Sequence, residues 1–164
     1  MDKFSSHPFG PFVFPNSEII IFGSFPSPKS RSDGFYYGNK QNRFWKILAS
    51  IYQEEVPLDI PSKKAFLKRN HIALYDVYEG LSIEGASDSS IKEAKVVDFI
   101  SLLKNTGIRR IYGNGKVAYN ALKEHYHGEL LVYYLPSSSP ANCRLKEGTI
   151  KTLWENALKS SKID

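Results

Sequence analysis

The segment Gly34–Trp45 holds the side chains of this sequence that are best suited to chemistry. It reads Gly-Phe-Tyr-Tyr-Gly-Asn-Lys-Gln-Asn-Arg-Phe-Trp, so five aromatic rings alternate with carboxamides and basic groups within eleven residues. An aromatic face can stack on a nucleobase, and a carboxamide can hydrogen-bond the edge of a base or position a water molecule. Tyr36 and Tyr37 are flanked by glycines and are therefore candidates for stacking, whereas we expect Trp45 to anchor a helix start in the core.

Two loops combine serine with proline. Residues 23–32 read Gly-Ser-Phe-Pro-Ser-Pro-Lys-Ser-Arg-Ser, and residues 136–142 read Pro-Ser-Ser-Ser-Pro-Ala-Asn. Serine hydroxyls and loop N–H groups donate well to phosphate oxygens, and proline reduces the entropy lost when a loop becomes ordered. Serine and proline are also ordinary turn residues, so their presence in one loop would carry little weight. Their presence in two loops favours a binding surface.

The positive charge lies in the same two regions. The chain has 22 Lys+Arg and 17 Asp+Glu, a net charge of +5. Residues 24–46 carry five basic side chains against one acid, residues 136–146 carry two against none, and the other residues sum to −1. Charge concentrated in this way is typical of a surface that binds a polyanion. It argues against a free nucleoside or nucleotide as the substrate, because a small molecule does not need basic residues on two distant loops.

Alternating strand and helix patterns predict the scaffold that must position these loops. Short apolar runs predict four strands at Glu18–Phe22, His71–Tyr75, Ile108–Tyr112 and Leu130–Leu135. Apolar residues at helical spacing predict helices over Asn42–Tyr52, over Ile91–Leu103 with Ser89 or Ser90 as the cap, from Gly115 onward, and over Gly148–Lys159. The longest linker is the loop Gly80–Asp88. This alternation predicts βαβ units and a parallel sheet covered on both faces.

The parallel sheet brings the Ser/Pro loops together. Ligands of open parallel sheets bind beyond the carboxyl ends of the strands, where the strand order reverses. One Ser/Pro loop follows the first predicted strand and the other follows the fourth. We therefore expect both loops to lie at the same edge of the sheet.

Three motifs, taken together, resemble the uracil-DNA glycosylase superfamily. They are Gly23-Ser24-Phe25-Pro26-Ser27, the block Tyr36–Trp45, and Leu135–Asn142. The hypoxanthine-DNA glycosylase branch is the most similar, and the mismatch-specific uracil glycosylases come next. The resemblance implies an α/β fold, a three-layer α/β/α sandwich with a central four-stranded parallel sheet. It also implies base flipping and hydrolysis of the bond between a deaminated base and deoxyribose.

The resemblance also implies roles for single residues. Asn39 would be the catalytic amide, Tyr37 would stack on the flipped base, and Asp76 would accept hydrogen bonds from ring N–H groups. Asn42 is the rival for the catalytic role, although we prefer to interpret it as a helix cap. The remaining base-pocket residues would be Gly23, Ser24 and Phe25. The DNA-contacting residues would be Ser27, Lys29, Arg31, Asn42, Arg43, Ser137, Ser138, Ser139, Asn142 and Arg144.

The sequence departs from the wider superfamily at Phe25. Many members carry Asn or Asp at this position to align or activate water, and some use a histidine in the second motif that this chain lacks. In the resembling branch the asparagine of the Tyr-Gly-Asn block takes that part, which points to Asn39. A carboxamide does not titrate near neutral pH, so Asn39 would orient and polarise water. Phe25 also keeps open the alternative of a non-catalytic nucleic-acid-binding module of the same fold.

Several classes of protein are not expected. The single cysteine, Cys143, excludes an internal disulfide and a four-thiolate metal site, and we expect no metal and no cofactor. Gly113–Ala118 fits a dinucleotide-binding pattern, but it follows the third strand and is interpreted as a tight turn. No lysine lies in an apolar context that would favour Schiff-base chemistry, so we expect a monofunctional hydrolase.

The chain-wide expectations follow from length and composition. We expect one domain over residues 1–164, without a signal peptide or a membrane-spanning segment, in the cytoplasm. Its partner would be double-stranded DNA that contains damaged or mismatched bases, and it would act as a monomer.

Overall fold

The centre of the fold is a four-stranded parallel sheet. The computed structural model describes residues 3–25, 32–83, 91–142 and 145–160. The sheet has the order β3-β2-β6-β7, with β2 at Ile19–Gly23, β3 at Ile72–Asp76, β6 at Arg110–Asn114 and β7 at Leu131–Leu135. Each strand overlaps one of the four that the sequence predicts, and each pairs in parallel with its neighbours. β2 and β3 are almost wholly buried because helices cover both faces.

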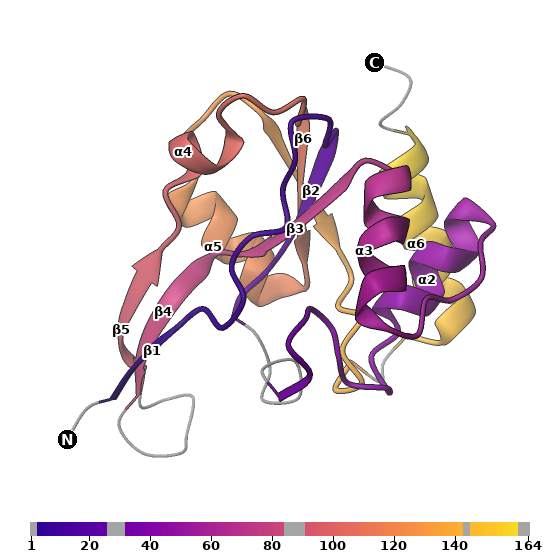
Figure 1. The fold of residues 1–164 in the computed structure, drawn as a ribbon, viewed down its shortest axis with the longest axis horizontal. Coiled ribbons are helices and arrows are strands. Elements are labelled where there is room, and N and C mark those ends of the chain that lie inside the picture. Colours follow the sequence, from indigo (N-terminus) through magenta and orange to yellow (C-terminus); the bar gives the residue numbers. More distant parts are fainter. Residues whose placement is uncertain (1–2, 26–31, 84–90, 143–144, 161–164) are drawn as a thin grey trace.

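Helices form the two outer layers. They are α2 (Phe44–Tyr52), α3 (Ile60–Arg69), α4 (Phe99–Leu103), α5 (Lys116–His125) and α6 (Glu147–Ser160). Figure 1 shows α2, α3 and α6 gathered on one side of the sheet and α4 and α5 on the other. α3 packs on β3 and α6 on β7, while α5 contacts β2, β6 and β7. The predicted three-layer α/β/α fold is confirmed.

A second sheet, which the sequence analysis did not predict, lies beside the first. It is antiparallel with the order β1-β4-β5, where β1 is Lys3–Ser6, β4 is Tyr78–Ile83 and β5 is Ile91–Val96. The expected helix over Ile91–Leu103 is therefore wrong in its first half, because β5 pairs with β4. The expected loop Gly80–Asp88 likewise begins inside β4.

Only the short helix α4 remains of that predicted helix. Its N-cap is Asp98, whose carboxylate accepts a hydrogen bond from the Ser101 backbone N–H at 3.2 Å. The expected caps, Ser89 and Ser90, lie outside the described residues. Of the helices that the structure describes, none is long and apolar enough to cross a lipid bilayer.

The core lies on both faces of the central sheet, against the α2, α3 and α6 layer and against α4 and α5. Trp45 is 4% exposed and acts as the core anchor that the sequence predicts, with its Nε1 donating to the Tyr36 carbonyl at 3.3 Å. Trp154 on α6 is fully buried and donates to the Pro136 carbonyl at 2.8 Å. Each indole N–H donates a hydrogen bond to a loop carbonyl. These two buried side chains therefore fix the positions of the loops that follow β2 and β7.

Candidate active site

A pocket lies at the carboxyl ends of all four parallel strands. Gly23 ends β2, Asp76 ends β3, Asn114 ends β6, and Ser137 follows β7. All four residues line the pocket, which sits where the strand order reverses between β2 and β6. The other lining residues are Ser24, Phe25, Tyr36, Tyr37, Asn39, Asn42, Ser138 and Ser139. Every residue expected in the base pocket is therefore brought to one place, together with Asn39.

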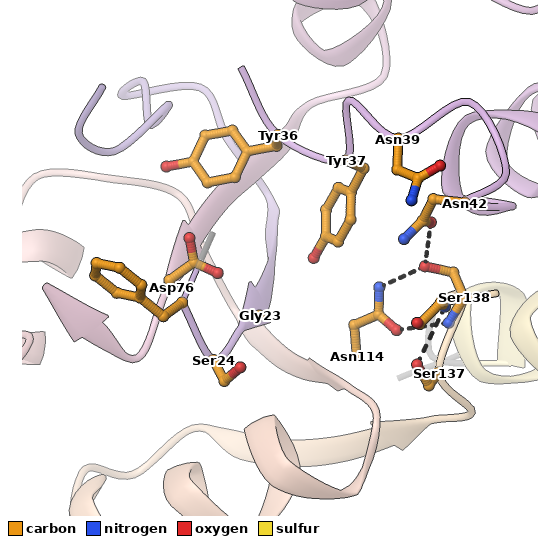
Figure 2. A pocket seen from close by; sticks show the side chains of 12 residues that line it. Gly23, Ser24, Tyr36, Tyr37, Asn39, Asn42, Asp76, Asn114, Ser137 and Ser138 are labelled. Carbon is orange, nitrogen blue, oxygen red and sulfur yellow. Dashed lines mark hydrogen bonds between the residues drawn. The ribbon is translucent and has the colours of Figure 1, made fainter. Parts of the chain in front are cut away.

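Asn39 is held by its own loop. Its Oδ1 accepts a hydrogen bond from the Gln41 backbone N–H at 2.9 Å, and its backbone carbonyl accepts from the Asn42 N–H at 2.9 Å. These two bonds form a turn that fixes the carboxamide at the pocket wall (Figure 2). The group cannot titrate near neutral pH, so any part that it plays in catalysis is positional or electrostatic.

Asn42 belongs to a network that joins three segments. Its Oδ1 accepts from the Phe44 N–H at 3.0 Å and from the Ser138 hydroxyl at 2.7 Å. The Ser138 hydroxyl also accepts from the Asn114 Nδ2 at 3.0 Å, and the Ser138 N–H donates to the Asn114 Oδ1 at 3.0 Å (Figure 2). Arg43 occupies the N-cap position of α2, but Asn42 satisfies the first N–H of the helix. The side chain therefore does the work expected of a cap.

The Asn114 side chain is a pocket element that the sequence analysis missed. The turn Gly113-Asn114-Gly115 is the tight strand-to-helix turn that was expected. A side chain at Gly113 would come 2.7 Å from the Tyr119 backbone, which explains the glycine there. The available signal was position: Asn114 ends a parallel strand at the edge where the other pocket residues lie.

Arg43 and Ser138 do not face outward as expected of DNA-contacting residues. The Arg43 guanidinium donates to the carbonyls of Ser139 at 2.9 Å, Asn142 at 2.7 Å and Leu145 at 3.2 Å. Ser138 is fully buried, with its hydroxyl in the network above. Both residues shape the loop after β7, because a guanidinium with several donors can hold several carbonyls in one geometry.

The other expected DNA-contacting residues either belong to the loop after β7 or lie outside the described residues. Ser137 and Ser139 line the pocket, and their hydroxyls accept from backbone N–H groups two residues further on. Asn142 donates from its side chain to the Ser137 carbonyl at 2.9 Å, inside the same loop. Ser27, Lys29, Arg31 and Arg144 lie outside the described residues.

Tyr37 forms the middle of the pocket wall. Its ring stacks on Phe44 with centroids 4.0 Å apart, so one face is already covered by the protein. Its backbone has φ of 53°, a left-handed conformation that is uncommon for a bulky residue and occurs at functional sites. Its hydroxyl is buried and has no hydrogen-bond partner among the described residues. Burial and the negative charge of Asp76 raise the pKa of Tyr37.

Asp76 is buried at the opposite end of the pocket from Asn39. Burial raises the pKa of its carboxyl group, and the hydrogen bond from His7 opposes that rise. Gly23 packs directly against it, since a Cβ at this position would lie 2.4 Å from the Asp76 Oδ1. Glycine is therefore required for the β2 end to approach the carboxylate.

The site does not resemble a metal centre. Among the residues that the structure describes, no group of three or more His, Cys, Asp or Glu side chains is placed to hold a metal ion. The pocket lining instead combines carboxamides, hydroxyls, aromatic rings and one carboxylate. Such a lining can hydrogen-bond a heterocycle and orient a water molecule.

Comparison with known proteins assigns the chain to a family. The family described as the uracil DNA glycosylase superfamily matches residues 11–159. A protein named hypoxanthine DNA glycosylase from Methanosarcina acetivorans is 37% identical over 144 residues, which cover 85% of this chain and 89% of that protein. A protein of the same name from Methanosarcina barkeri is 34% identical over 156 residues, covering 92% and 96%.

A solved structure agrees with this assignment. The solution NMR structure of a candidate uracil DNA glycosylase from Methanosarcina acetivorans superimposes with a TM-score of 0.78 at 31% identity, and covers 98% of this chain and 99% of that one. Family, relatives and fold therefore agree with the motifs at the strand ends. The chain belongs to the uracil DNA glycosylase superfamily, and the family predicted from its motifs is confirmed.

Proposed function

We propose that this protein is a monofunctional DNA glycosylase that flips a deaminated base out of duplex DNA and hydrolyses its N-glycosidic bond. Hypoxanthine is the main substrate and uracil a second one, and an abasic site is the product. The observation that carries the proposal is the pocket at the four strand ends, which places Asn39 and Asp76 on either side of Tyr37 (Figure 2). The names of the two relatives support the choice of base.

Asn39 acts on the water nucleophile. Cleavage of the glycosidic bond leaves positive charge on the sugar and negative charge on the departing base, so fixed dipoles and good positioning supply most of the help. The Gln41 N–H holds the Asn39 carboxamide in place. The carboxamide can then orient and polarise a water molecule without accepting a proton from it. DNA phosphates help to stabilise the sugar cation.

Asp76 and Tyr37 bind the base at the other end of the pocket. The Asp76 carboxylate accepts from a ring N–H of the base, and the Tyr37 side chain, covered on one ring face by Phe44, lies at the same end. Phe25 adds an apolar wall. Base binding is thereby separated from the amide that acts on water.

The DNA backbone runs over a basic groove beside the pocket. A second hollow shares Tyr37, Asn39 and Asn42 with the base pocket. It is also lined by Lys40, Lys46 and Lys63, with the carboxylates of Asp33 and Asp59 near Lys63. These ammonium groups neutralise phosphates on either side of the flipped nucleotide. Ser137, Ser139 and Asn142 extend this contact, and the sequence adds Ser27, Lys29, Arg31 and Arg144 as further residues that contact DNA. The protein acts as a monomer, in the cytoplasm, on duplexes with damaged or mismatched bases.

A strand-cleavage assay tests the proposal. Labelled duplexes that each hold one deoxyinosine, deoxyuridine or mismatched thymidine are incubated with the protein and then treated with hot alkali, which cuts only at abasic sites. We expect cleavage at deoxyinosine and weaker cleavage at deoxyuridine. Salt-sensitive binding without cleavage of any duplex would contradict the proposal and favour the non-catalytic alternative.

A further inference from the structure

A histidine from outside the family motifs reaches the back of the pocket. His7 Nε2 lies 2.8 Å from the Asp76 Oδ2, and the two side chains are only 4% and 5% exposed. His7 precedes the region matched by the family, which begins at residue 11. It is brought there by the second sheet: β1 pairs with β4, and the His7 N–H donates to the Glu79 carbonyl at 2.6 Å.

The partners of its other ring nitrogen fix the tautomer of His7. The Gly10 N–H lies 3.0 Å from Nδ1 and the Phe9 N–H lies 3.4 Å from it. Backbone N–H groups can only donate, so Nδ1 is an acceptor and the ring proton of the neutral imidazole is on Nε2. His7 therefore donates to Asp76, and a hydrogen bond of this kind favours the ionised carboxylate.

The other oxygen of Asp76 has no such partner. No hydrogen bond joins Oδ1 to another described residue, and Oδ1 lies against Gly23 at the pocket wall. The unpartnered Tyr37 hydroxyl also lies by Gly23, 3.3 Å from the point where a Cβ would be. An acceptor and a donor that the protein leaves unsatisfied therefore flank the same glycine (Figure 2). A buried hydroxyl without a partner, as in Tyr37, is costly, which indicates that a ligand satisfies it.

This pair matches a chemical feature that deaminated bases share. Adenine and cytosine present a ring-nitrogen acceptor beside an amino donor. Deamination reverses both, so hypoxanthine and uracil present a ring N–H donor beside a carbonyl acceptor. The Asp76 Oδ1 can accept from that N–H while the Tyr37 hydroxyl donates to that carbonyl. Adenine or cytosine would set its ring-nitrogen acceptor against the Asp76 acceptor, and such a mismatch gives strong discrimination.

We propose that Asp76 and Tyr37 read the N–H/C=O edge of the flipped base, and that His7 is the positioning residue that keeps Asp76 an acceptor. The inference rests on the proposed glycosylase function and adds a residue from the second sheet to it. His7 touches no substrate atom. It occupies Oδ2, which leaves Oδ1 alone to face the base.

The pH dependence of excision tests the role of His7. The titratable groups that face Asp76 are His7, Tyr36, Tyr37 and Tyr75, with Glu79 beside Tyr75, and burial raises the pKa of all three tyrosines. In His7→Phe the ring contact with Tyr75, now at 4.8 Å, can persist while the donor is lost. The Asp76 pKa then rises, so we expect the rising limb of the single-turnover rate on deoxyinosine to move up by about one pH unit or more, with activity recovered at high pH.

Phe9→Leu is the matched packing control. It removes an aromatic contact with His7 at 4.9 Å but leaves the hydrogen bond to Asp76, so its pH profile should keep the wild-type position. A His7→Phe rate that falls by the same factor at every pH would show a merely structural role and overturn the proposal.

A second variant keeps the test decisive should His7→Phe not fold. In Asp76→Asn, the His7 donor holds the carboxamide oxygen, so the amide NH₂ occupies the place of Oδ1 and presents a donor to the base N–H. We expect roughly a 100-fold loss of deoxyinosine excision, and roughly a tenfold loss in Tyr37→Phe. Wild-type rates in both variants would overturn the inference alone. A wild-type protein that excises no deaminated base would overturn the proposed function as well.

Discussion

The pocket has two walls that differ in how their polar atoms are satisfied. The amide wall consists of Asn39, Asn42, Asn114 and Ser138, and the carboxylate wall consists of His7, Tyr37 and Asp76. In the amide wall each side chain has at least one hydrogen bond within the protein, and none titrates near neutral pH. In the carboxylate wall a buried hydroxyl has no partner and a buried acid depends on a histidine.

This difference separates two tasks. A wall whose bonds are made within the protein is rigid before DNA arrives, which suits the positioning of water and of the loops around it. A wall with unmet hydrogen bonds gains most when a base of the right pattern enters, which suits recognition. We therefore expect damage to the amide wall to lower the rate without altering the choice of base, and damage to the carboxylate wall to alter both.

The largest loss of excision rate is expected from a substitution that adds an atom next to the Asp76 carboxylate. In Gly23→Ala, the added Cβ would meet the Asp76 Oδ1 at 2.4 Å, so the carboxylate must move. A displacement of about 1 Å at a reacting site can cost roughly 100-fold in rate, and we expect a loss of that size in single-turnover excision of hypoxanthine. Gly148→Ala, where a Cβ would meet nothing within 4 Å, is the control and should excise at the wild-type rate. Equal rates for the two variants would show that the Asp76 position does not matter.

A smaller effect is expected from opening the amide wall. Ser138→Ala removes the hydroxyl that bonds both Asn42 and Asn114, and the site is fully buried. We expect the free energy of unfolding to fall by about 1–3 kcal/mol in a denaturant titration, and excision to fall severalfold with an unchanged preference for hypoxanthine over uracil. Ser50→Ala is the control, since Ser50 is exposed on α2 and does not line the pocket. A changed base preference in Ser138→Ala would contradict the assignment of base choice to the carboxylate wall alone.

A still smaller effect is expected at the basic groove, which neither wall includes. Lys46 is exposed on α2 and lines the hollow next to the base pocket. In Lys46→Gln, we expect DNA binding to weaken a fewfold for every sequence, and the slope of log binding constant against log salt to fall by about 1. Lys123→Gln on α5 lies outside that hollow and should leave the slope unchanged. A wild-type slope in Lys46→Gln would remove this groove from the DNA path.

The two walls also differ in their pH dependence of stability. Burial raises the Asp76 pKa above its ordinary value of 3.8, so between these two pKa values the folded chain binds a proton that the unfolded chain does not. This contribution to stability is present at low pH and is lost as pH rises through the folded pKa. We expect wild type to lose stability relative to Asp76→Asn over that range, as measured by unfolding titrations at a series of pH values. A difference that is constant with pH would contradict the burial argument.

The elements that the sequence could predict are those with local signals. The four parallel strands are consecutive apolar runs, and the loops after them could be assigned to one edge because parallel strands share a direction. The helix α3 also has local signals: Asp59 caps it by accepting from the Ser62 N–H at 2.7 Å, and Pro61 lies in its first turn.

The features that could not be predicted depend on distant contacts. Residues 91–96 have an ambiguous pattern, and their pairing with β4 decides that they form a strand. The sequence predicts Arg43 to contact DNA, but the carbonyls to which it donates lie about a hundred residues away, in the loop after β7. His7 reaches Asp76 across 69 residues because of the β1–β4 register, which no motif shows.

One measurement tests most directly the claim that the amide wall supports the chemistry. Single-turnover excision from a deoxyinosine duplex is compared between wild type, Asn39→Ala and the control Asn120→Ala, an exposed position on α5. We predict a rate at least about tenfold lower in Asn39→Ala at every pH, with DNA binding little changed, and a wild-type rate in Asn120→Ala. An Asn39→Ala protein that excises hypoxanthine at the wild-type rate would contradict the account and move the search for the catalytic group to Asn42.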